Sequence, residues 1–292
     1  MKLGLNLPSH GVDTSATVAE HARHAEDAGF ESVWVGDHLI PAGRPFLDAT
    51  LVLAAVAAVT ERVKLGFGVM VLPLRETAWA AKQIASLQHL SGGRVLLGVG
   101  SGGPVHGDAA FRAVGVPFAE RGRRTDEALE VLAGLVEGRR MRLDGADVTL
   151  SPGAAMPPVL IGAGPERRVA RFADEWYPAF STPAEVSAGV GRLASLAVEH
   201  GRPVPQVTVG LSFGLGDVPA GEVDAQVKGL TEYGMSEDAA RASLLTGPPE
   251  RAAERLAELA DAGVHRVVGM PFPSDRRRQA ELLAEAARRA AV

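Results

Sequence analysis

The sequence contains no cysteine, which excludes disulfide bonds, thiolate nucleophiles and cysteine metal ligands. It also lacks an apolar run of the about 20 residues that a membrane span requires, and Pro8 breaks the first apolar stretch before it reaches the length of a signal-peptide core. Its 30 Lys and Arg residues are mixed with 35 Asp and Glu, without the basic stripe that nucleic acid recognition requires. We therefore expect a cytoplasmic protein that binds neither a membrane nor nucleic acid.

Short apolar runs alternate with helical patterns along the whole chain. Strands are expected at residues 3–7, 32–36, 64–72, 95–99, 158–162, 176–179, 207–213 and 264–270. Helices are expected at residues 15–28, 48–60, 76–90, 120–138, 166–174, 183–200, within 222–262, and at 274–291, whereas residues 139–157 have no helical pattern. Eight strand–helix units without a linker predict a single-domain (β/α)8 barrel, a TIM barrel, over residues 1–292.

Functional residues of such a barrel lie at the carboxyl ends of its strands. Residues 94–106 read RVLLGVGSGGPVH, in which glycine replaces side chains where the fourth strand should end. Glycine permits a ring or a phosphate to approach the backbone closely, so we interpret this stretch as the floor of a cofactor site. Gly98, Gly100 and Gly103 also fit the G-x-G-x-x-G pattern of a dinucleotide-binding turn, but the prolines and glycines that follow interrupt the helix that this motif needs.

Asp37 and His38 form the most distinctive polar pair, directly after the second strand. A histidine at a strand end suits a hydrogen-bond donor to a cofactor or a general acid. Alternatively, Asp37 caps the loop and His38 is an ordinary packing or surface histidine. His10, His38 and His106 lack the spacing of metal ligands and have few carboxylates near them, so no metal site is predicted.

A second glycine turn follows the fifth strand, in residues 158–176, PVLIGAGPERRVARFADEW. Gly162 and Gly164 precede a helix whose N–H groups could bind a phosphate, with Arg167 or Arg168 adding positive charge. The alternative is a glycine turn that leads into an amphipathic helix with solvated arginines.

Together these segments resemble the bacterial luciferase-like monooxygenase family, in particular its oxidoreductases that use the deazaflavin coenzyme F-420, an 8-hydroxy-5-deazaflavin. The resemblance is carried by AEHARHAEDAGFESVWVGDHL, VKLGFGVMVLPLRETAWAAKQIASLQHLSGGRVLLGVGSGG, GVPFAERGRRTDEALEVL, PVLIGAGPERRVARFADEWYP and PPERAAERLAELADAGVHRVV. It implies hydride transfer between ring carbon five of the coenzyme and a small-molecule substrate, in a homodimer. The alternatives are a monooxygenase that uses reduced FMN and a non-catalytic flavin-binding barrel.

The resemblance also implies roles for individual residues. His38 would be the proton donor or polariser, with Asp37 beside it, and Gly68–Val69 matches the position of a non-proline cis peptide that backs the ring. Further cofactor contacts are expected from Met70, Ser101, Gly102 and His106, and from the phosphate-side loop Gly162, Ala163, Gly164, Pro165 and Glu166. Gly103 stands where the sugar-phosphate dehydrogenases of the family carry a catalytic glutamate, so oxidation of a sugar phosphate is not expected.

Overall fold

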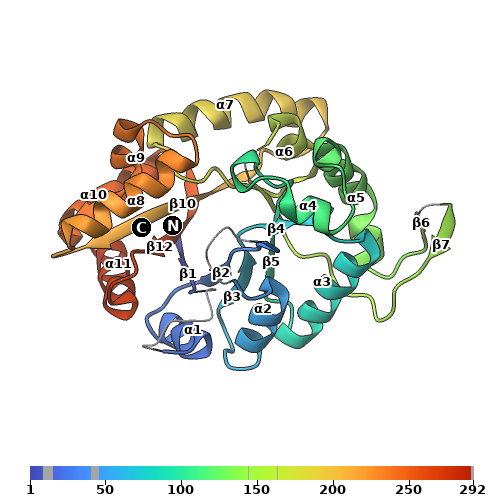
Figure 1. Ribbon diagram of the computed structural model, residues 1–292, viewed down its shortest axis with the longest axis horizontal. Helices are drawn as coiled ribbons and strands as arrows, with labels where there is room; N and C mark the ends of the chain where they lie inside the picture. Colours follow the sequence, from blue (N-terminus) through green and yellow to red (C-terminus); the bar gives the residue numbers. More distant parts are fainter. Residues whose placement is uncertain (9–15, 41–45, 144, 163, 291–292) are drawn as a thin grey trace.

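Eight parallel strands close into a barrel in the computed structural model, which describes residues 1–8, 16–40, 46–143, 145–162 and 164–290 (Figure 1). The barrel strands are β1 (Lys2–Asn6), β2 (Ser32–Val35), β3 (Lys64–Phe67), β5 (Val95–Gly100), β8 (Val159–Ile161), β9 (Glu175–Trp176), β10 (Gln206–Leu215) and β12 (Val264–Pro271). Each strand pairs with the next in this order, and β12 pairs with β1 to complete the circle. The predicted (β/α)8 TIM barrel is confirmed.

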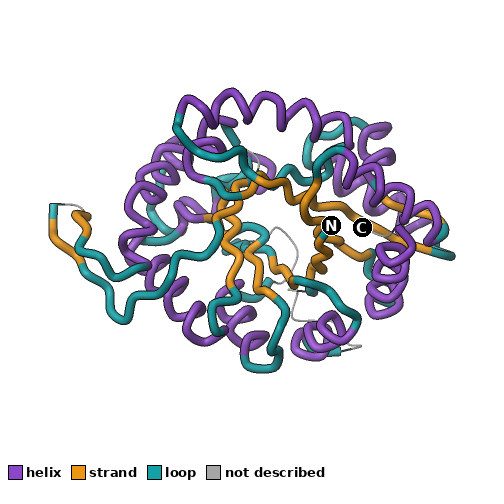
Figure 2. The backbone as a smooth tube through the Cα atoms, turned by 180° about the vertical axis from the view of Figure 1, so that it is seen from behind, coloured by secondary structure: helices purple, strands orange, loops and turns teal. Residues whose placement is uncertain are grey.

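Helices surround the barrel, as both views of the backbone show (Figures 1 and 2). The main helices are α1 (Val18–Asp27), α2 (Ala49–Ala57), α3 (Thr77–Ser91), α5 (Arg121–Val136), α6 (Glu166–Phe172), α7 (Pro183–Glu199), α8 (Ala220–Glu232), α10 (Pro249–Asp261) and α11 (Arg276–Ala290). Their starts follow local chemistry: the Asp48 carboxylate accepts the Leu51 N–H, and Thr17 and Glu20 form a capping box. Of the helices in the described ranges, none combines the length and apolarity needed to cross a membrane.

The third predicted strand is interrupted. Residues 64–72 form β3, then β4 (Met70–Val71) and the 3-10 helix η1 (Leu72–Leu74), with a cis peptide bond between Gly68 and Val69, as the resemblance implies. Both β3 and β4 pair with β5, so the segment between them bulges away from the strand path.

Three other segments contain elements that the sequence patterns did not indicate. The loop after β5 holds η2 (Pro104–His106), α4 (Ala109–Ala113) and η3 (Phe118–Glu120). Residues 139–157, expected to be irregular, include the antiparallel strands β6 (Met141–Leu143) and β7 (Ala146–Val148), which project from the barrel (Figures 1 and 2). Between α8 and α10 lie α9 (Glu237–Ser243), within the range where helix was expected, and the unexpected strand β11 (Leu245–Gly247), which pairs with the end of β10.

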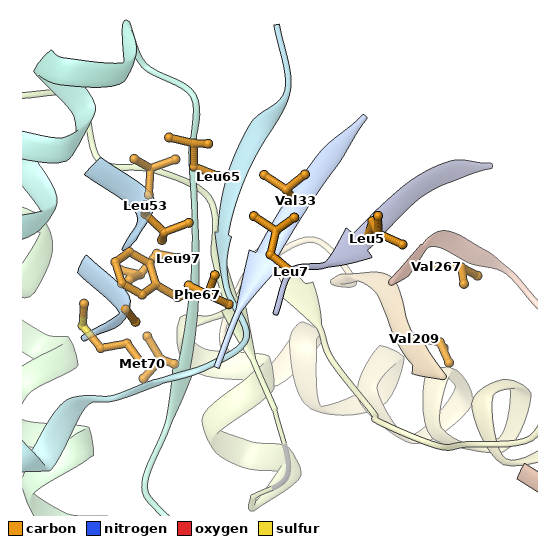
Figure 3. Close-up of a cluster of buried hydrophobic side chains, with 14 of the residues drawn as sticks. Leu5, Leu7, Val33, Leu53, Leu65, Phe67, Met70, Leu97, Val209 and Val267 are labelled. Atoms are coloured by element: carbon orange, nitrogen blue, oxygen red, sulfur yellow. The ribbon is translucent and has the colours of Figure 1, made fainter. Parts of the chain in front are cut away.

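The side chains of the strands alternate between two apolar layers, as strand geometry requires. Leu5, Val33 and Leu65 belong to the large cluster that includes helix residues such as Leu53 (Figure 3). A separate cluster is formed by side chains that point to the other side of the strands: Trp34, Leu96, Leu160, Tyr177 and Val268. Trp34 is fully buried, and a Cβ atom at Gly4 or Gly66 would come within 2.6 or 2.2 Å of its ring, so these glycines make room for the indole.

A buried polar network lies near the amino ends of the strands. Arg266 in β12 is 1% exposed and binds the carboxylate of Glu175, the hydroxyl of Thr208 at 3.1 Å and the carboxylate of Glu31 at 3.0 Å. Burial opposes the charge of Glu31, but the hydrogen bond and charge of Arg266 outweigh burial and lower the pKa of Glu31. Because a barrel's reactive face is at the opposite ends of the strands, we assign this network to stability.

Candidate functional site

A cavity of about 460 Å³ opens at the carboxyl ends of β2, β3 and β5. Its volume is within the range of small-molecule sites. Three segments build most of its wall: the residues after β2, the bulge between β3 and β4, and the loop after β5. Its lining includes Asp37, His38, Gly68, Val69, Val71, Leu74, Ser101, Gly102, Gly103 and His106.

A second cavity, of about 540 Å³, lies beside α11 and is bordered by the loop after β10. Its wall contains carboxylates and arginines that pair with one another, such as Glu250 and Glu285 with Arg289. It also lies at strand ends, those of β10 and β12, but it contains none of the predicted cofactor or catalytic residues, so we place the candidate site in the cavity beside β2, β3 and β5.

Val69 forms the inner wall of the candidate site and explains two of the glycines in β5. A Cβ atom at Gly98 would lie 2.0 Å from the Phe67 carbonyl oxygen, and one at Gly100 would lie 2.6 Å from Val69 Cγ2. Both distances are far below ordinary contact, so these glycines accommodate the bulge. Space without a side chain lies further along, at Gly103, where a Cβ atom would meet nothing closer than 3.7 Å, and a cofactor floor there stays a prediction.

Asp37 supports the bulge rather than offering an unpaired carboxylate. Its side chain is 7% exposed, and its Oδ2 atom accepts the Val71 N–H at 2.8 Å. Arg75 donates to both carboxylate oxygens, at 2.6 and 2.9 Å. Burial opposes the charge of Arg75, but the bonds to Asp37 outweigh it and raise the pKa of the guanidinium. The pair therefore fixes β4 against the segment after β2. Asp37 does bind a backbone N–H, but that group belongs to β4 and not to the loop that Asp37 was expected to cap.

His38 and His106 meet at the mouth of the cavity. Their ring centroids are 4.6 Å apart, and the ring planes meet at 69°. His38 also contacts the ring of Phe46, with centroids 4.7 Å apart. Burial lowers the pKa of His106, which favours the neutral form of its imidazole. The sequence pattern identified both histidines, and the fold brings them together from segments 68 residues apart in the chain.

Tyr233 completes this group, and sequence reasoning missed it. Its Oη atom lies 3.1 Å from His106 Nε2, and the two rings meet edge to face with centroids 5.2 Å apart. Tyr233 follows α8, 127 residues from His106 in the sequence. No local motif marks it, because it reaches the site only through the tertiary fold.

Several predicted cofactor residues lie away from the cavity. The Met70 side chain is fully buried in the apolar cluster of Figure 3, and the neighbouring Val71 lines the cavity instead. The predicted phosphate-side residues that the structure describes, Gly162, Gly164, Pro165 and Glu166, do not line it either, and Ala163 lies outside the described residues, as does His10.

The arginines near the predicted phosphate loop have different environments from those expected. Arg168 is buried, and its guanidinium binds the Asp126 carboxylate and the Gly122 carbonyl oxygen, which joins α6 to α5. Glu166 accepts a hydrogen bond from Arg192 at 2.8 Å. The picture of solvated arginines is therefore wrong for Arg168, and a phosphate contact at residues 162–166 stays a prediction.

Comparison with known proteins identifies the family. A family model described as luciferase-like monooxygenase matches residues 1–215. The chain belongs to the luciferase-like monooxygenase family. This luciferase-like chain is 30% identical to 4-hydroxyprotoasukamycin monooxygenase from Streptomyces nodosus subsp. asukaensis, over 83% of this chain and 70% of the relative. It is 31% identical to 5,10-methylenetetrahydromethanopterin reductase from Methanolobus tindarius, over 68% of this chain and 60% of that relative.

Other relatives of this luciferase-like chain are matched over shorter stretches or by fold alone. The chain spans 58% of the length of an uncharacterized Mycobacterium tuberculosis protein, to which it is 37% identical. A solved F-420-dependent secondary alcohol dehydrogenase, in complex with a coenzyme–acetone adduct, superposes with a TM-score of 0.83 at 17% identity, covering 99% of this chain and 98% of that one. A type II Baeyer–Villiger monooxygenase component in complex with FMN superposes with a TM-score of 0.75 at 16% identity, covering 98% of this chain and 97% of that one. At these identities the likeness establishes the fold.

Proposed function

We propose that this luciferase-like protein is an oxidoreductase that transfers a hydride between the deazaflavin coenzyme F-420 and a small organic substrate. The observation that carries the proposal is the cavity itself, in which His38 and the side-chain-free backbone of Gly102 and Gly103 border one space, next to Val69. A solved secondary alcohol dehydrogenase and a solved tetrahydromethanopterin reductase, both described as dependent on this coenzyme, support it.

The chemistry of the cavity wall fits a flat and largely uncharged ring. Val69, Val71 and Leu74 supply apolar surface, and open space adjoins the backbone at Gly103. Among the described lining residues, Asp37 is the only Asp, Glu, Lys or Arg, and Arg75 neutralises it. A ring bound there would contact apolar side chains on one side and backbone amides on the other, the mixture typical of small-molecule sites.

His38 is the proposed proton donor. When bound, the coenzyme supplies or accepts a hydride at ring carbon five. An imidazole beside the reacting carbonyl can donate the proton that the substrate oxygen requires, or take it back from an alcohol, because its ordinary pKa lies near neutrality. Asp37 and Arg75 hold the wall against which a bound ring would rest, and the open space at Gly103 would leave room for a substrate.

The alternative within the family is a monooxygenase that uses reduced FMN and dioxygen, and monooxygenases among the relatives favour it. Titration of the purified protein with F-420 and with FMN separates the two. We expect micromolar binding of F-420, and binding of FMN alone would refute the proposal. If neither ligand raises the melting temperature, both coenzyme-dependent functions are refuted, since at 100 times its dissociation constant a ligand stabilises the native state by about 2.7 kcal/mol.

The role of His38 is tested by His38→Ala. Loss of a general acid typically lowers the rate by about 10²-fold or more, so we expect turnover to fall by that factor while coenzyme affinity changes little. His200→Ala, at an exposed position after α7, is the matched control and should leave both quantities unchanged. An unchanged turnover number in His38→Ala would exclude the proton-donor role. The small-molecule substrate and the homodimer stay predictions.

A further inference from the structure

Tyr233 reaches the candidate site from outside the segments that build most of its wall. It stands at the end of α8 with 55% of its surface exposed, yet it lines the cavity and its Oη atom lies 3.1 Å from His106 Nε2. An exposed phenol has bulk water available as a partner. The phenol therefore does not need His106 as a partner, and we ask what the contact does for the histidine.

The neutral form of the imidazole is favoured, because burial lowers the pKa of His106. Among the described residues, the rings of His38, from the segment after β2, and of Tyr233 pack against it. Asp37 also borders the cavity, but both its oxygens accept hydrogen bonds from Arg75. A neutral imidazole carries one N–H and one acceptor nitrogen, and the partner of one nitrogen decides which state the other takes.

The direction of the hydrogen bond follows from the chemistry of the two groups. A phenol is a good O–H donor and a poor acceptor, whereas the unprotonated nitrogen of imidazole is a good acceptor. The favoured arrangement therefore has Tyr233 Oη donating to His106 Nε2, with the ring proton on Nδ1. His38 lies against the same imidazole, with ring centroids 4.6 Å apart, so the two histidines border one part of the cavity.

We propose that Tyr233 is a positioning residue that holds His106 in the Nδ1–H tautomer, so that His106 offers a second hydrogen-bond donor beside His38 to a substrate oxygen. Two donors at one place suit a carbonyl or alcohol oxygen, which defines the substrate class more narrowly than hydride transfer alone. The substrate class rests on the proposed function, whereas the tautomer of His106 does not.

The tautomer is measured without coenzyme or substrate. In protein labelled with ¹⁵N-histidine, the ring nitrogen signals of His106, assigned with His106→Gln, report which nitrogen carries the proton at neutral pH. We expect Nδ1–H in the wild type and a shift toward Nε2–H, the form that free imidazole side chains prefer, in Tyr233→Phe. Thr231→Val is the matched control, since it removes a hydroxyl from the same helix end that bonds only the Lys228 carbonyl among the described contacts. Nε2–H in the wild type, or identical tautomers in the wild type and Tyr233→Phe, would overturn the inference.

A kinetic arm then tests the substrate class. For carbonyl reduction with F-420, Tyr233→Phe should lower kcat/KM by roughly fivefold, the change expected from loss of one neutral hydrogen bond, with coenzyme affinity retained. If the wild type is active but the tautomer of His106 is the same in Tyr233→Phe, the positioning role of Tyr233 is refuted and the proposed function stands. The expected tautomer change in a protein that neither binds F-420 nor reduces carbonyls refutes the proposed function and leaves the positioning role intact.

Discussion

Gly100→Ala tests whether the glycines of β5 serve the bulge that shapes the cavity. The added Cβ atom would lie 2.6 Å from Val69 Cγ2, whereas ordinary contacts begin at 3.4 Å, so the valine methyl must retreat by close to 0.8 Å. Overpacking of this kind costs typically about 1–3 kcal/mol. The alanine also lowers the conformational entropy of the unfolded chain, which stabilises the native state by about 0.4–1 kcal/mol. We expect a net destabilisation of about 1–2 kcal/mol, together with weaker coenzyme binding because Val69 lines the cavity.

The measurement is a double-mutant cycle by urea denaturation, with Gly100→Ala, Val69→Ala and the double variant. Val69→Ala removes the methyl that the new Cβ atom would strike, so the cost of Gly100→Ala should disappear in that background. The coupling free energy should be about 1–2 kcal/mol, within the range measured for residues in contact. Equal destabilisation by Gly100→Ala in both backgrounds would show that the Val69 contact is not the reason for the glycine.

Gly103→Ala is the matched control for the same loop. Its φ of −96° and ψ of 149° suit any residue, and the new Cβ atom would meet no atom closer than 3.7 Å. We expect Gly103→Ala to be neutral or to stabilise the fold by up to about 1 kcal/mol. The contrast separates glycines required by packing from a glycine that leaves space.

Two further predictions concern the charged groups. Asp37→Asn removes the nearer carboxylate partner of the largely buried Arg75 and leaves only Asp48, at 3.8 Å, so we expect a loss of about 1–3 kcal/mol in urea denaturation; wild-type stability would show that the pair does not hold β4. The pKa of Glu31 is lowered in the native state, so its stabilising contribution is complete above the ordinary carboxyl value of 4.5 and is lost as pH falls through the lowered value. Melting temperatures measured from pH 7 to about pH 3 should therefore depend less on pH in Glu31→Gln than in the wild type, and parallel curves would contradict this assignment.

The sequence by itself determined the barrel and the face on which its site lies. Alternating apolar runs and helical patterns are local properties, and eight such units leave few topologies that bury all the strands. The start of a helix near residue 48 and the position of His38 at a strand end follow from the same local patterns. A residue at the carboxyl end of a barrel strand must face the functional side, whatever surrounds it.

Tertiary structure alone decided the details of the site. The pattern of residues 64–72 is that of one continuous strand, because periodicity does not reveal a bulge that forms only when Gly98 and Gly100 in the next strand make room for it. Asp37 was expected beside a cofactor, but its partner Arg75 comes from the segment after that bulge. No local pattern marks Tyr233, since its contact with His106 depends on where the fold places the end of α8. Such contacts are set by distances between segments remote in the chain, and a pattern read along one strand or helix contains no information about them.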